Sequence, residues 1–514
     1  MKHRFLLFIC FAFALEATFA QSGSVPLAPY SRWNEAQYYQ ADLPHTAFRY
    51  HLYNDTLPQR GKGCLIKRKI MDEHLLNFNH DNFNLYVDFL PDFQIGVDKG
   101  SNKHVTLWED TRGFKVSGNV GKKLYFETEV YETQEKLPFY VDSAAAKIGS
   151  VPRYIGNYHP GANTTSTLDI NYSSARIVYI PTDFLQFELG YGRNFIGDGY
   201  RSLLLSDWAF NYPYLRATGQ FGQFEYSAMW SQYLNPQDTG STAQYGITPR
   251  KWAQTFYLDW HFAKKGNVGL MESVVWADAS ANGSRDIAPT LFSPIIFLHG
   301  THTPSGIDNY TLTGLNAKYE FARRTFVYGQ FAYSNFLRSD WTKRYAFQLG
   351  LRSASVFGVK GLNFVGEYNM AKAYMYAGNA YGINYAQYNQ PLADPYGANF
   401  KEVVGVLNYQ IKRWWFRLEG IYSSYMNDAN IDEDCGSNIL LPLPTSEQAA
   451  GGGVRTHVGY GNLRVAFMLN PKINLRIEGG VTLRRQSDVM GNSTHDNVFE
   501  LGLRASFRDL IEDF

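Results

Sequence analysis

Apolar and polar residues alternate in short runs that recur along the chain from Asn82 onward. In one of them, Leu185, Phe187 and Leu189 alternate with Gln186 and Glu188. Apolar side chains at every second position indicate a strand with one apolar and one polar face. The clearest runs are 185–191, 362–370, 414–422 and 475–484. About eighteen such runs can be recognised, so the pattern predicts an all-β protein.

The connections between these runs alternate between short and long. The short ones fall at 121–122, 181–182, 221–222, 264–266, 322–323, 412–413 and 471–472. The long ones are about twenty residues before Arg112 and the segments 133–174, 195–214, 234–251, 278–309, 372–399 and 426–455. Outer-membrane barrels join tight periplasmic turns to large external loops in this way. We therefore predict a transmembrane antiparallel β-barrel of about 18 strands over residues 81–514, located in the cell outer membrane.

The polar positions of the runs carry charges of both signs. Apolar positions of a barrel wall face lipid, so these charges are expected in the lumen. Charges of one sign would suggest a selectivity lining, whereas mixed charges more often pair and brace the wall. We favour bracing for Glu127, Glu129, Glu188, Lys318, Glu320, Arg352, Glu367, Arg417, Glu419, Arg464, Arg476, Glu478, Arg484, Glu500 and Arg504.

The N-terminal part of the chain precedes the alternating pattern. Residues 1–20 combine Lys2 and Arg4 with a short apolar run and small residues before position 21, which predicts a secretory signal peptide. Residues 21–80 lack alternation, and 31–41 has a helix-compatible composition. We predict a small, partly helical periplasmic segment ahead of the barrel.

Composition narrows the class of protein. The formal net charge of +1 argues against a nucleic-acid partner. Aromatic residues make up 16% of the chain, which suits the aromatic girdles of a barrel. After signal cleavage, Cys64 and Cys435 remain. A disulfide between them and two free thiols are both compatible with the sequence.

The segment 190–207 is the densest in candidate binding groups. It turns at a Gly-Asp-Gly sequence and carries, close together, Arg193, Asn194, Asp198, Arg201 and Asp207. Such groups could offer bidentate and acceptor contacts to sugar hydroxyls or acidic polymers. Alternatively, the Arg and Asp side chains lock the loop onto itself.

A second candidate is the predicted external loop 372–399, which is rich in tyrosine. Tyrosine offers a flat apolar face and a polar tip, which suits stacking on sugar rings. Alternatively, these side chains pack the loop against its neighbours. The candidate binding residues here are Tyr374, Tyr381, Tyr385 and Tyr388.

Signals for an enzyme are weak. The chain has no Gly-x-Ser-x-Gly sequence, and His299 and His302 have no third ligand nearby in the sequence. The acidic run 432–434 is typical of a solvated loop. We predict no enzymatic activity, no metal and no cofactor.

The final run, 497–507, places Phe499, Leu501, Leu503 and Phe507 on one face. This pattern looks like the C-terminal targeting signal of outer-membrane proteins, and Phe514 is an alternative anchor for it. It predicts a lipid-facing Phe507 and contact with the barrel-assembly machinery during biogenesis.

Four segments resemble the Wzi-like capsule-assembly family, especially its branch with the gliding-motility protein RemB. They are GYGRNFIGDGYRSLLLSD at 190–207, TGLNAKYEFARRTFVYGQFAYSNF at 313–336, NYAQYNQPLADPYGANFKE at 384–402 and GSNILLP at 436–442. The resemblance implies an eighteen-stranded outer-membrane barrel with a small helical periplasmic element. It also implies a non-catalytic surface role in polysaccharide attachment or in gliding and secretion.

We therefore expect a surface protein that binds polysaccharide or a partner of the surface and secretion machinery. Its surroundings would be outer-membrane lipid and lipopolysaccharide. The alternative is a porin-like diffusion channel for small polar solutes. Mixed lumenal charges and loops long enough to fold inward disfavour a wide pore.

Overall fold

The computed structural model describes residues 63–100, 104–152, 154, 167–236, 249–263, 265–280, 283–284, 293–297, 309–335, 342–428, 434–447, 451–508 and 513–514. The predicted signal peptide 1–20 and the helix-compatible stretch 31–41 lie outside these residues. Helix α3 (Leu65–Met71) and strand β1 (Leu76–His80) fall in the predicted N-terminal segment. Helix α4 (Phe139–Ile148) lies between β4 and β5. No described helix is long and apolar enough to cross a membrane.

The barrel strands are β2 (Phe83–Lys99), β3 (His104–Val120), β4 (Leu124–Lys136), β5 (Leu168–Thr182), β6 (Leu185–Gly192), β7 (Tyr212–Phe221), β8 (Phe224–Leu234), β9 (Arg250–Ala263), β10 (Gly266–Ala277), β13 (Asn309–Ala322), β14 (Thr325–Ser334), β15 (Tyr345–Ala354), β16 (Leu362–Ala371), β19 (Phe400–Ile411), β20 (Trp414–Asp428), β21 (Gly453–Asn470), β22 (Leu475–Asp488) and β23 (Ser493–Arg504). Short pairs form in the loops: β11 (Ala279–Ser280) with β12 (Gly283–Ser284), and β17 (Ala386–Gln387) with β18 (Gln390–Pro391). The 3₁₀ turn η3 spans Val356–Gly358.

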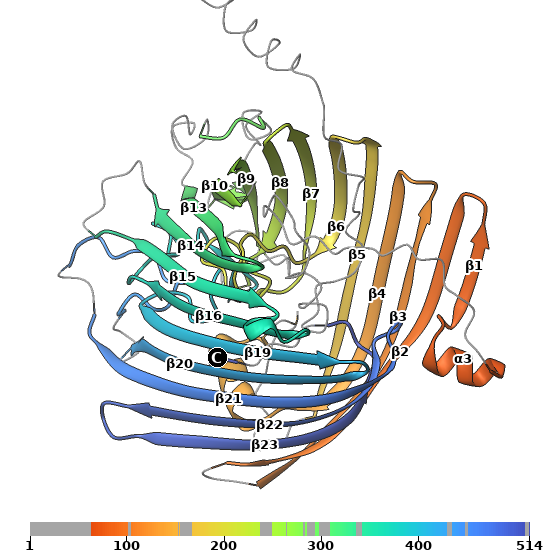
Figure 1. Ribbon diagram of the computed structural model, residues 1–514. Helices are drawn as coiled ribbons and strands as arrows, with labels where there is room; N and C mark the ends of the chain where they lie inside the picture. Colours follow the sequence, from red (N-terminus) through yellow and green to blue (C-terminus); the bar gives the residue numbers. More distant parts are fainter. Residues whose placement is uncertain are drawn as a thin grey trace, which may run out of the picture.

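Each barrel strand pairs antiparallel with its neighbours in the chain, and the sheet closes on itself (Figure 1). Closure joins β2 to β23, from Asp92 opposite Arg504 to Asp98 opposite Val498. Strand β1 pairs with the start of β2, beyond the end of β23. The predicted antiparallel barrel of about eighteen strands is confirmed.

The wall has the expected two faces. Outward side chains are exposed and apolar, for example Leu189, Leu349 and Leu418, which are 59%, 58% and 53% exposed. Their neighbours along the strands face the lumen and are buried and largely polar. A closed barrel leaves no strand edge unpaired in lipid, and its outer surface is apolar. These features define an outer-membrane protein, as predicted.

The alternation of tight turns and long connections is also present, with two exceptions at the end with the long connections. The connection between β22 and β23 is only residues 489–492. The connection between β2 and β3 is only residues 100–103, not about twenty residues. Both strands are long because their alternation continues where Asp92 and Gln94 face inward and Phe93 and Ile95 face outward. The polar inward residues were mistaken for a loop. By the general rule for such barrels, the tight turns face the periplasm.

The end of the closing strand differs from the prediction for Phe507. Strand β23 stops at Arg504, and the backbone N–H groups of Ala505 and Ser506 donate to Asp92 Oδ1 at 2.6 and 2.9 Å. The chain then turns into the barrel (Figure 1), where Phe507 is 8% exposed. The ammonium of Lys115 lies 4.3 Å from the centre of the Phe507 ring. Phe507 is therefore lumenal, and its predicted lipid-facing position is wrong.

Helix α3 is fixed at the tight-turn end of the barrel. Asn470 Nδ2 donates to the carbonyl oxygens of Lys69 and Glu73 at 3.0 and 2.9 Å. Arg413 forms an ion pair of 3.0 Å with Asp72. This element thus sits at the end that we assign to the periplasm.

Candidate functional site

The connection 193–211, called here the arginine loop, folds into the barrel. Its Asp198 is 1% exposed and faces two cations of the wall, at 3.4 Å from Lys318 Nζ and 3.3 Å from Arg352 Nη2. Asn316 Nδ2 donates to the same carboxylate at 3.0 Å. The partners belong to β13 and β15, so Asp198 ties the loop to the wall.

The next residues approach the wall closely. Glu367 of β16 accepts hydrogen bonds from the backbone N–H groups of Tyr200 and of Arg201, the latter at 3.1 Å. A Cβ atom on Gly199 would lie 2.3 Å from Glu367 Oε1. Glycine at position 199 therefore allows this approach, and a side chain there would displace the Glu367 carboxylate.

Arg201 lies at the centre of a buried ion-pair cluster. Its guanidinium contacts Glu402 at 3.2 Å and Asp513 at 3.1 Å, and all three side chains are at most 4% exposed. Asp394 lies 4.0 Å away. Burial lowers the pKa of Arg201, but the carboxylates of Asp513 and Glu402 outweigh it, so its pKa stays well above the usual value. Burial, together with nearby Glu402, raises the pKa of Asp394 well above its usual range.

The tyrosine loop, residues 372–399, also folds inward. Tyr376 donates to the carbonyl of Leu203 at 2.9 Å, and the rings of Tyr376 and Tyr385 stack with centres 6.0 Å apart. The N–H of Ser206 donates to the carbonyl of Leu392 at 2.7 Å. The two loops share a buried apolar core that includes Leu203, Leu204, Leu205, Met375, Tyr376, Ile383, Tyr385 and Leu392.

The structure thus brings the two predicted loops together, and most of the predicted site residues make contacts inside the protein. Arg193 is half-buried and donates to the carbonyl of Asp207 at 3.1 Å, while buried Asn194 accepts from Arg216 at 3.0 Å. Buried or half-buried side chains are those of Arg193, Asn194, Asp198, Arg201, Asp207, Tyr374, Tyr385 and Tyr388. Tyr381 is 70% exposed. A ligand-binding role for these residues stays a prediction.

The described residues after β23, 505–508 and 513–514, which we call the tail, were missed by sequence reasoning as part of the site. Arg508 contacts Asp92 at 3.3 Å, Glu109 at 3.0 Å and Thr133 at 2.8 Å. The ring of Phe514 packs 5.1 Å from that of Trp208 in the arginine loop. The signal in the sequence was the run of charged residues that begins at Arg508, directly after the alternating pattern. Charges do not suit a segment that faces lipid.

Helix α4 adds a further layer at the end with the long connections. It begins after Pro138 and stops at Gly149, which has a left-handed φ of 75°. Tyr140 lies 6.2 Å from the Phe514 ring, and Lys147 Nζ donates to Asn427 at 2.6 Å. The helix, the two loops and the tail together form one plug inside the barrel.

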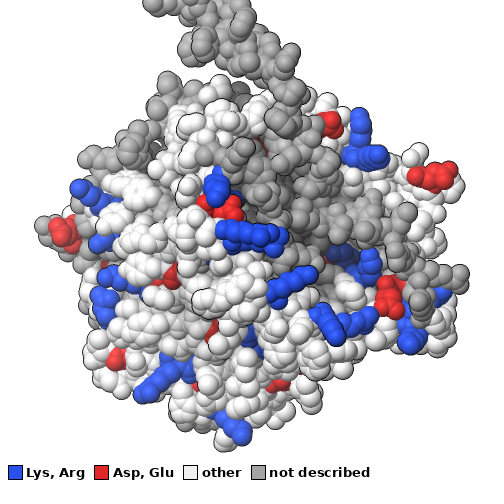
Figure 2. All heavy atoms as spheres, in the orientation of Figure 1, with Lys and Arg blue, Asp and Glu red and all other residues white. Residues whose placement is uncertain are grey.

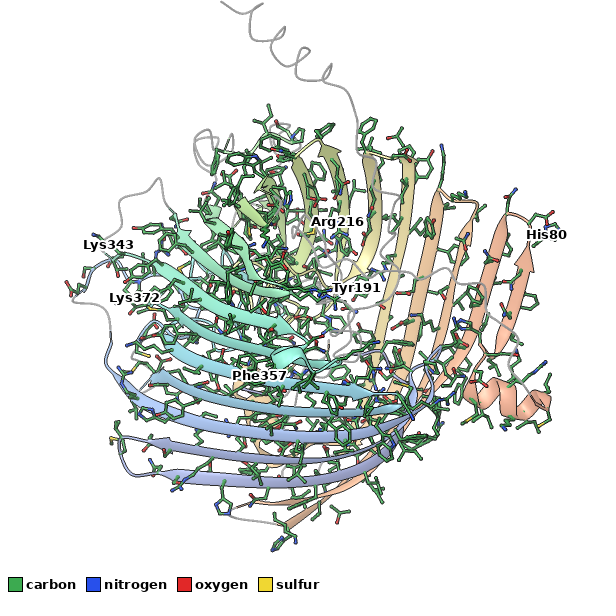
Figure 3. The ribbon with its side chains drawn as sticks, in the orientation of Figure 1. His80, Tyr191, Arg216, Lys343, Phe357 and Lys372 are labelled. Atoms are coloured by element: carbon green, nitrogen blue, oxygen red, sulfur yellow. The ribbon has the colours of Figure 1, made fainter. Side chains whose placement is uncertain are left out.

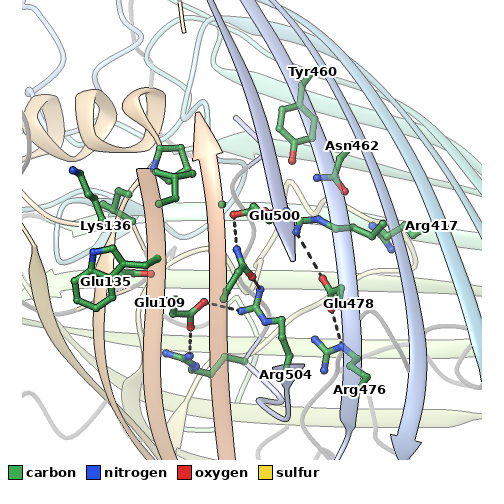
Figure 4. A pocket seen from close by; sticks show the side chains of 18 of the residues that line it. Glu109, Glu135, Lys136, Arg417, Tyr460, Asn462, Arg476, Glu478, Glu500 and Arg504 are labelled. Carbon is green, nitrogen blue, oxygen red and sulfur yellow. Dashed lines mark hydrogen bonds and ion pairs between the residues drawn. The ribbon is translucent and has the colours of Figure 1, made fainter. Parts of the chain in front are cut away.

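A polar cavity of about 100 Å³ remains beside the plug, between β2–β4 and β20–β23. Figure 4 shows its charged lining. The shortest ion pairs there are Arg464–Glu500 at 2.6 Å and Arg476–Glu478 at 2.8 Å, and Arg504–Glu109 is 3.2 Å. Arg464 reaches Glu500 across β22, Arg504 reaches Glu109 across β2, and Arg476 and Glu478 lie on the same strand. Opposite charges therefore pair along the wall, as the mixed signs in the sequence predicted.

Cys64 is exposed, Cys435 is buried, and both are free thiols. Among the described residues, no group of three or more His, Cys, Asp or Glu side chains is arranged to hold a metal ion.

The sequence matches no protein-family model and no curated protein. Several solved structures have a similar fold. Wzi, an Escherichia coli outer-membrane protein involved in group 1 capsule assembly and described as a carbohydrate-binding β-barrel, is 13% identical, with a TM-score of 0.49 over 82% of this chain and 85% of Wzi. Pseudomonas aeruginosa OprD is 8% identical (TM-score 0.41, 81% and 94% covered). OccK7 of the same organism is 9% identical (0.45, 83% and 99%). Similarities this low do not indicate a function.

Proposed function

We propose that this barrel is a non-catalytic surface protein that binds polysaccharide, or a partner of the surface machinery, at the end with the long connections. This role follows from the family resemblance of the sequence, and it is the attachment of a polymer or partner to the cell surface. It does not require solute passage through the barrel.

The observation that carries the proposal is the plug. A diffusion channel needs a continuous water-filled path, and buried apolar side chains oppose one. Here Leu203, Leu204 and Tyr385 are 0% exposed within the lumen, and the ion pairs of Arg201 hold the arginine loop in place. Two long connections therefore fill the lumen of the barrel. This supports a function at the end with the long connections.

Tyr381 is the predicted site residue best placed for a polymer. Its side chain is 70% exposed on the tyrosine loop, whereas Tyr385 of the same loop is buried. An exposed tyrosine can stack on a sugar ring and bond a hydroxyl group with its own. Stacking between two aromatic rings contributes about 0.5–1.5 kcal/mol. A polymer held by contacts of this size would need several of them.

The test uses the purified full-length barrel and surface polysaccharide extracted from the source bacterium. Binding is followed by co-sedimentation of the polymer with barrel-containing vesicles. Tyr381→Ser should weaken binding while heat-modifiable folded barrel stays at parental levels. Tyr381→Phe, which keeps the ring, should retain most of it. No binding by the parent barrel would contradict the polysaccharide form of the proposal.

The alternative function, a channel for small polar solutes, has one feature in its favour. The cavity beside the plug is lined by paired charges such as Arg464 and Glu500, and charged linings occur along solute paths. Its volume of about 100 Å³ is enough for a few water molecules. We favour the attachment role because the plug fills the lumen beside this cavity and opposes a continuous path through the barrel.

A further inference from the structure

The tight turns at the barrel end opposite the long connections are rich in basic residues. Turns that follow β3, β9, β13, β15, β19 and β21 contain Lys or Arg, whereas those after β5 and β7 do not. We call these residues the basic rim: Lys122, Lys123, Lys265, Arg323, Arg324, Lys360, Lys412, Arg413 and Lys472. Strand pairing places the turns at one end of the barrel although they are far apart in the sequence.

The rim is exposed and has few carboxylates to neutralise it. Except for half-buried Arg413 and Lys472, the rim side chains are exposed. The described turn residues include the acidic Asp81 and Asp183, Asp72 forms its ion pair with Arg413, and Glu320 accepts from the backbone N–H of Arg324 at 2.7 Å. Figure 2 shows one side of the barrel, with Lys and Arg side chains near η3 and also at the opposite strand ends, and with fewer Asp and Glu side chains among them. The chain as a whole carries a formal charge of only +1, so the rim is a local concentration of positive charge.

Aromatic and apolar side chains stand directly beside the rim cations. Phe321 is 52% exposed next to the Arg323–Arg324 turn, and Trp414 is 47% exposed next to Arg413. Phe357, in the turn that carries Lys360, is 97% exposed (Figure 3). Aromatic side chains mark the interface between the hydrocarbon core and the headgroups. The adjacent cations are therefore at headgroup level.

We propose that the basic rim binds the phosphate groups of anionic phospholipids in the leaflet that faces the tight turns. This interaction surface is separate from the proposed attachment site and does not depend on it. The rim continues the lipid-facing wall, so phospholipid headgroups are its immediate neighbours. Long Lys and Arg side chains can reach headgroup phosphates while their stems lie along apolar surface. The contacts would fix the depth and tilt of the barrel in the bilayer.

The test compares two variants of the full-length barrel in nanodiscs. The rim variant is Arg323→Gln, Arg324→Gln, Lys360→Gln and Lys412→Gln. The control variant removes four cations near the opposite strand ends: Lys99→Gln, Lys343→Gln, Lys372→Gln and Arg455→Gln. Figure 3 shows Lys343 and Lys372 at the end of the strands away from Phe357. Native mass spectrometry counts phosphatidylglycerol and phosphatidylcholine molecules retained by each barrel.

The parent and the control variant should retain phosphatidylglycerol in preference to phosphatidylcholine. The rim variant should lose this preference, with apparent affinity for phosphatidylglycerol falling about tenfold or more. Equal retention by the rim variant and the parent would overturn the proposal, as would equal loss in the control variant. Displacement of phosphatidylglycerol by inorganic phosphate at the same phosphate concentration would also overturn the proposal, because the rim would then bind a free anion.

A measurement on the unmodified barrel keeps the proposal testable if the rim variant does not fold. Because the rim cations are exposed, their attraction to headgroups is screened by salt. Retention of phosphatidylglycerol by the parent should therefore fall as sodium chloride rises, while retention of phosphatidylcholine stays constant. Salt-independent retention of phosphatidylglycerol would contradict binding by the rim.

Discussion

Replacing Arg201 by Ala should destabilise the barrel, because this side chain joins the arginine loop to the wall and to the tail. The substitution leaves the carboxylates of Glu402 and Asp513, both 0% exposed, without the cation that lies 3.2 and 3.1 Å from them. Removing one partner of a buried ion pair costs about 3–5 kcal/mol. That is a large part of the 5–15 kcal/mol that stabilises a typical protein.

The assay is equilibrium unfolding by urea in lipid vesicles, followed by tryptophan fluorescence. Trp208 reports on the plug because its ring contacts Phe514 at 5.1 Å. Arg193→Ala is the matched control. Arg193 is half-buried and its charged guanidinium donates to the carbonyl of Asp207, so its loss should cost about 1.5–3 kcal/mol, less than the loss of Arg201. Adding Asp513→Asn to Arg201→Ala should restore part of the stability, because it removes an unpaired buried charge.

The contrary result would be clear. If Arg201→Ala unfolds at the same urea concentration as the parent while polymer binding falls, Arg201 contacts the ligand and does not lock the loop. The sequence alone left these two roles of the arginines open, and the buried geometry favours the lock.

Three further predictions concern topology, the tail and pH. Epitope tags in the connections after β4, β10 and β20 should be labelled on intact cells and tags in the turns after β3 and β21 should not; labelling of the turns would reverse the orientation. Phe507→Ala should lower stability by about 3–5 kcal/mol in the urea assay, whereas a change within 1 kcal/mol would argue against its lumenal packing. Burial raises the pKa of Asp434 to about 6, above its ordinary value of 3.8, so the folded loop holds this proton more tightly than the unfolded chain. Protection of loop 434–447 from protease should therefore decrease as pH rises from 4 to 6, and Asp434→Asn should remove that dependence; an unchanged pH profile in the variant would contradict the assignment to Asp434.

The barrel wall could be predicted from the sequence because lipid constrains every second residue. Leu185, Phe187 and Leu189 had to alternate with polar residues, whatever the rest of the chain does. The pattern failed where lumenal carboxylates interrupted it. Asp92 and Asp98 made strand β2 resemble a loop, although both residues pair with β23 where the barrel closes.

The interior could not be predicted in the same way, because its contacts join distant parts of the chain. The partners of Arg201 lie 201 and 312 residues further along the sequence. No local pattern states that loops 193–211 and 372–399 fold inward and share a core. The local sequence did identify both loops as unusual. It could not show that Tyr381 is exposed and Tyr385 is buried, because this difference depends on how the plug folds.

Planar-bilayer conductance of the purified full-length barrel tests the central claim most directly. The plug, held by the ion pairs of Arg201 and Arg508, should leave no path for bulk ion flow. We expect insertion of folded barrel without large, stable conductance steps. Large and stable steps from each inserted barrel would contradict the account and establish a diffusion channel.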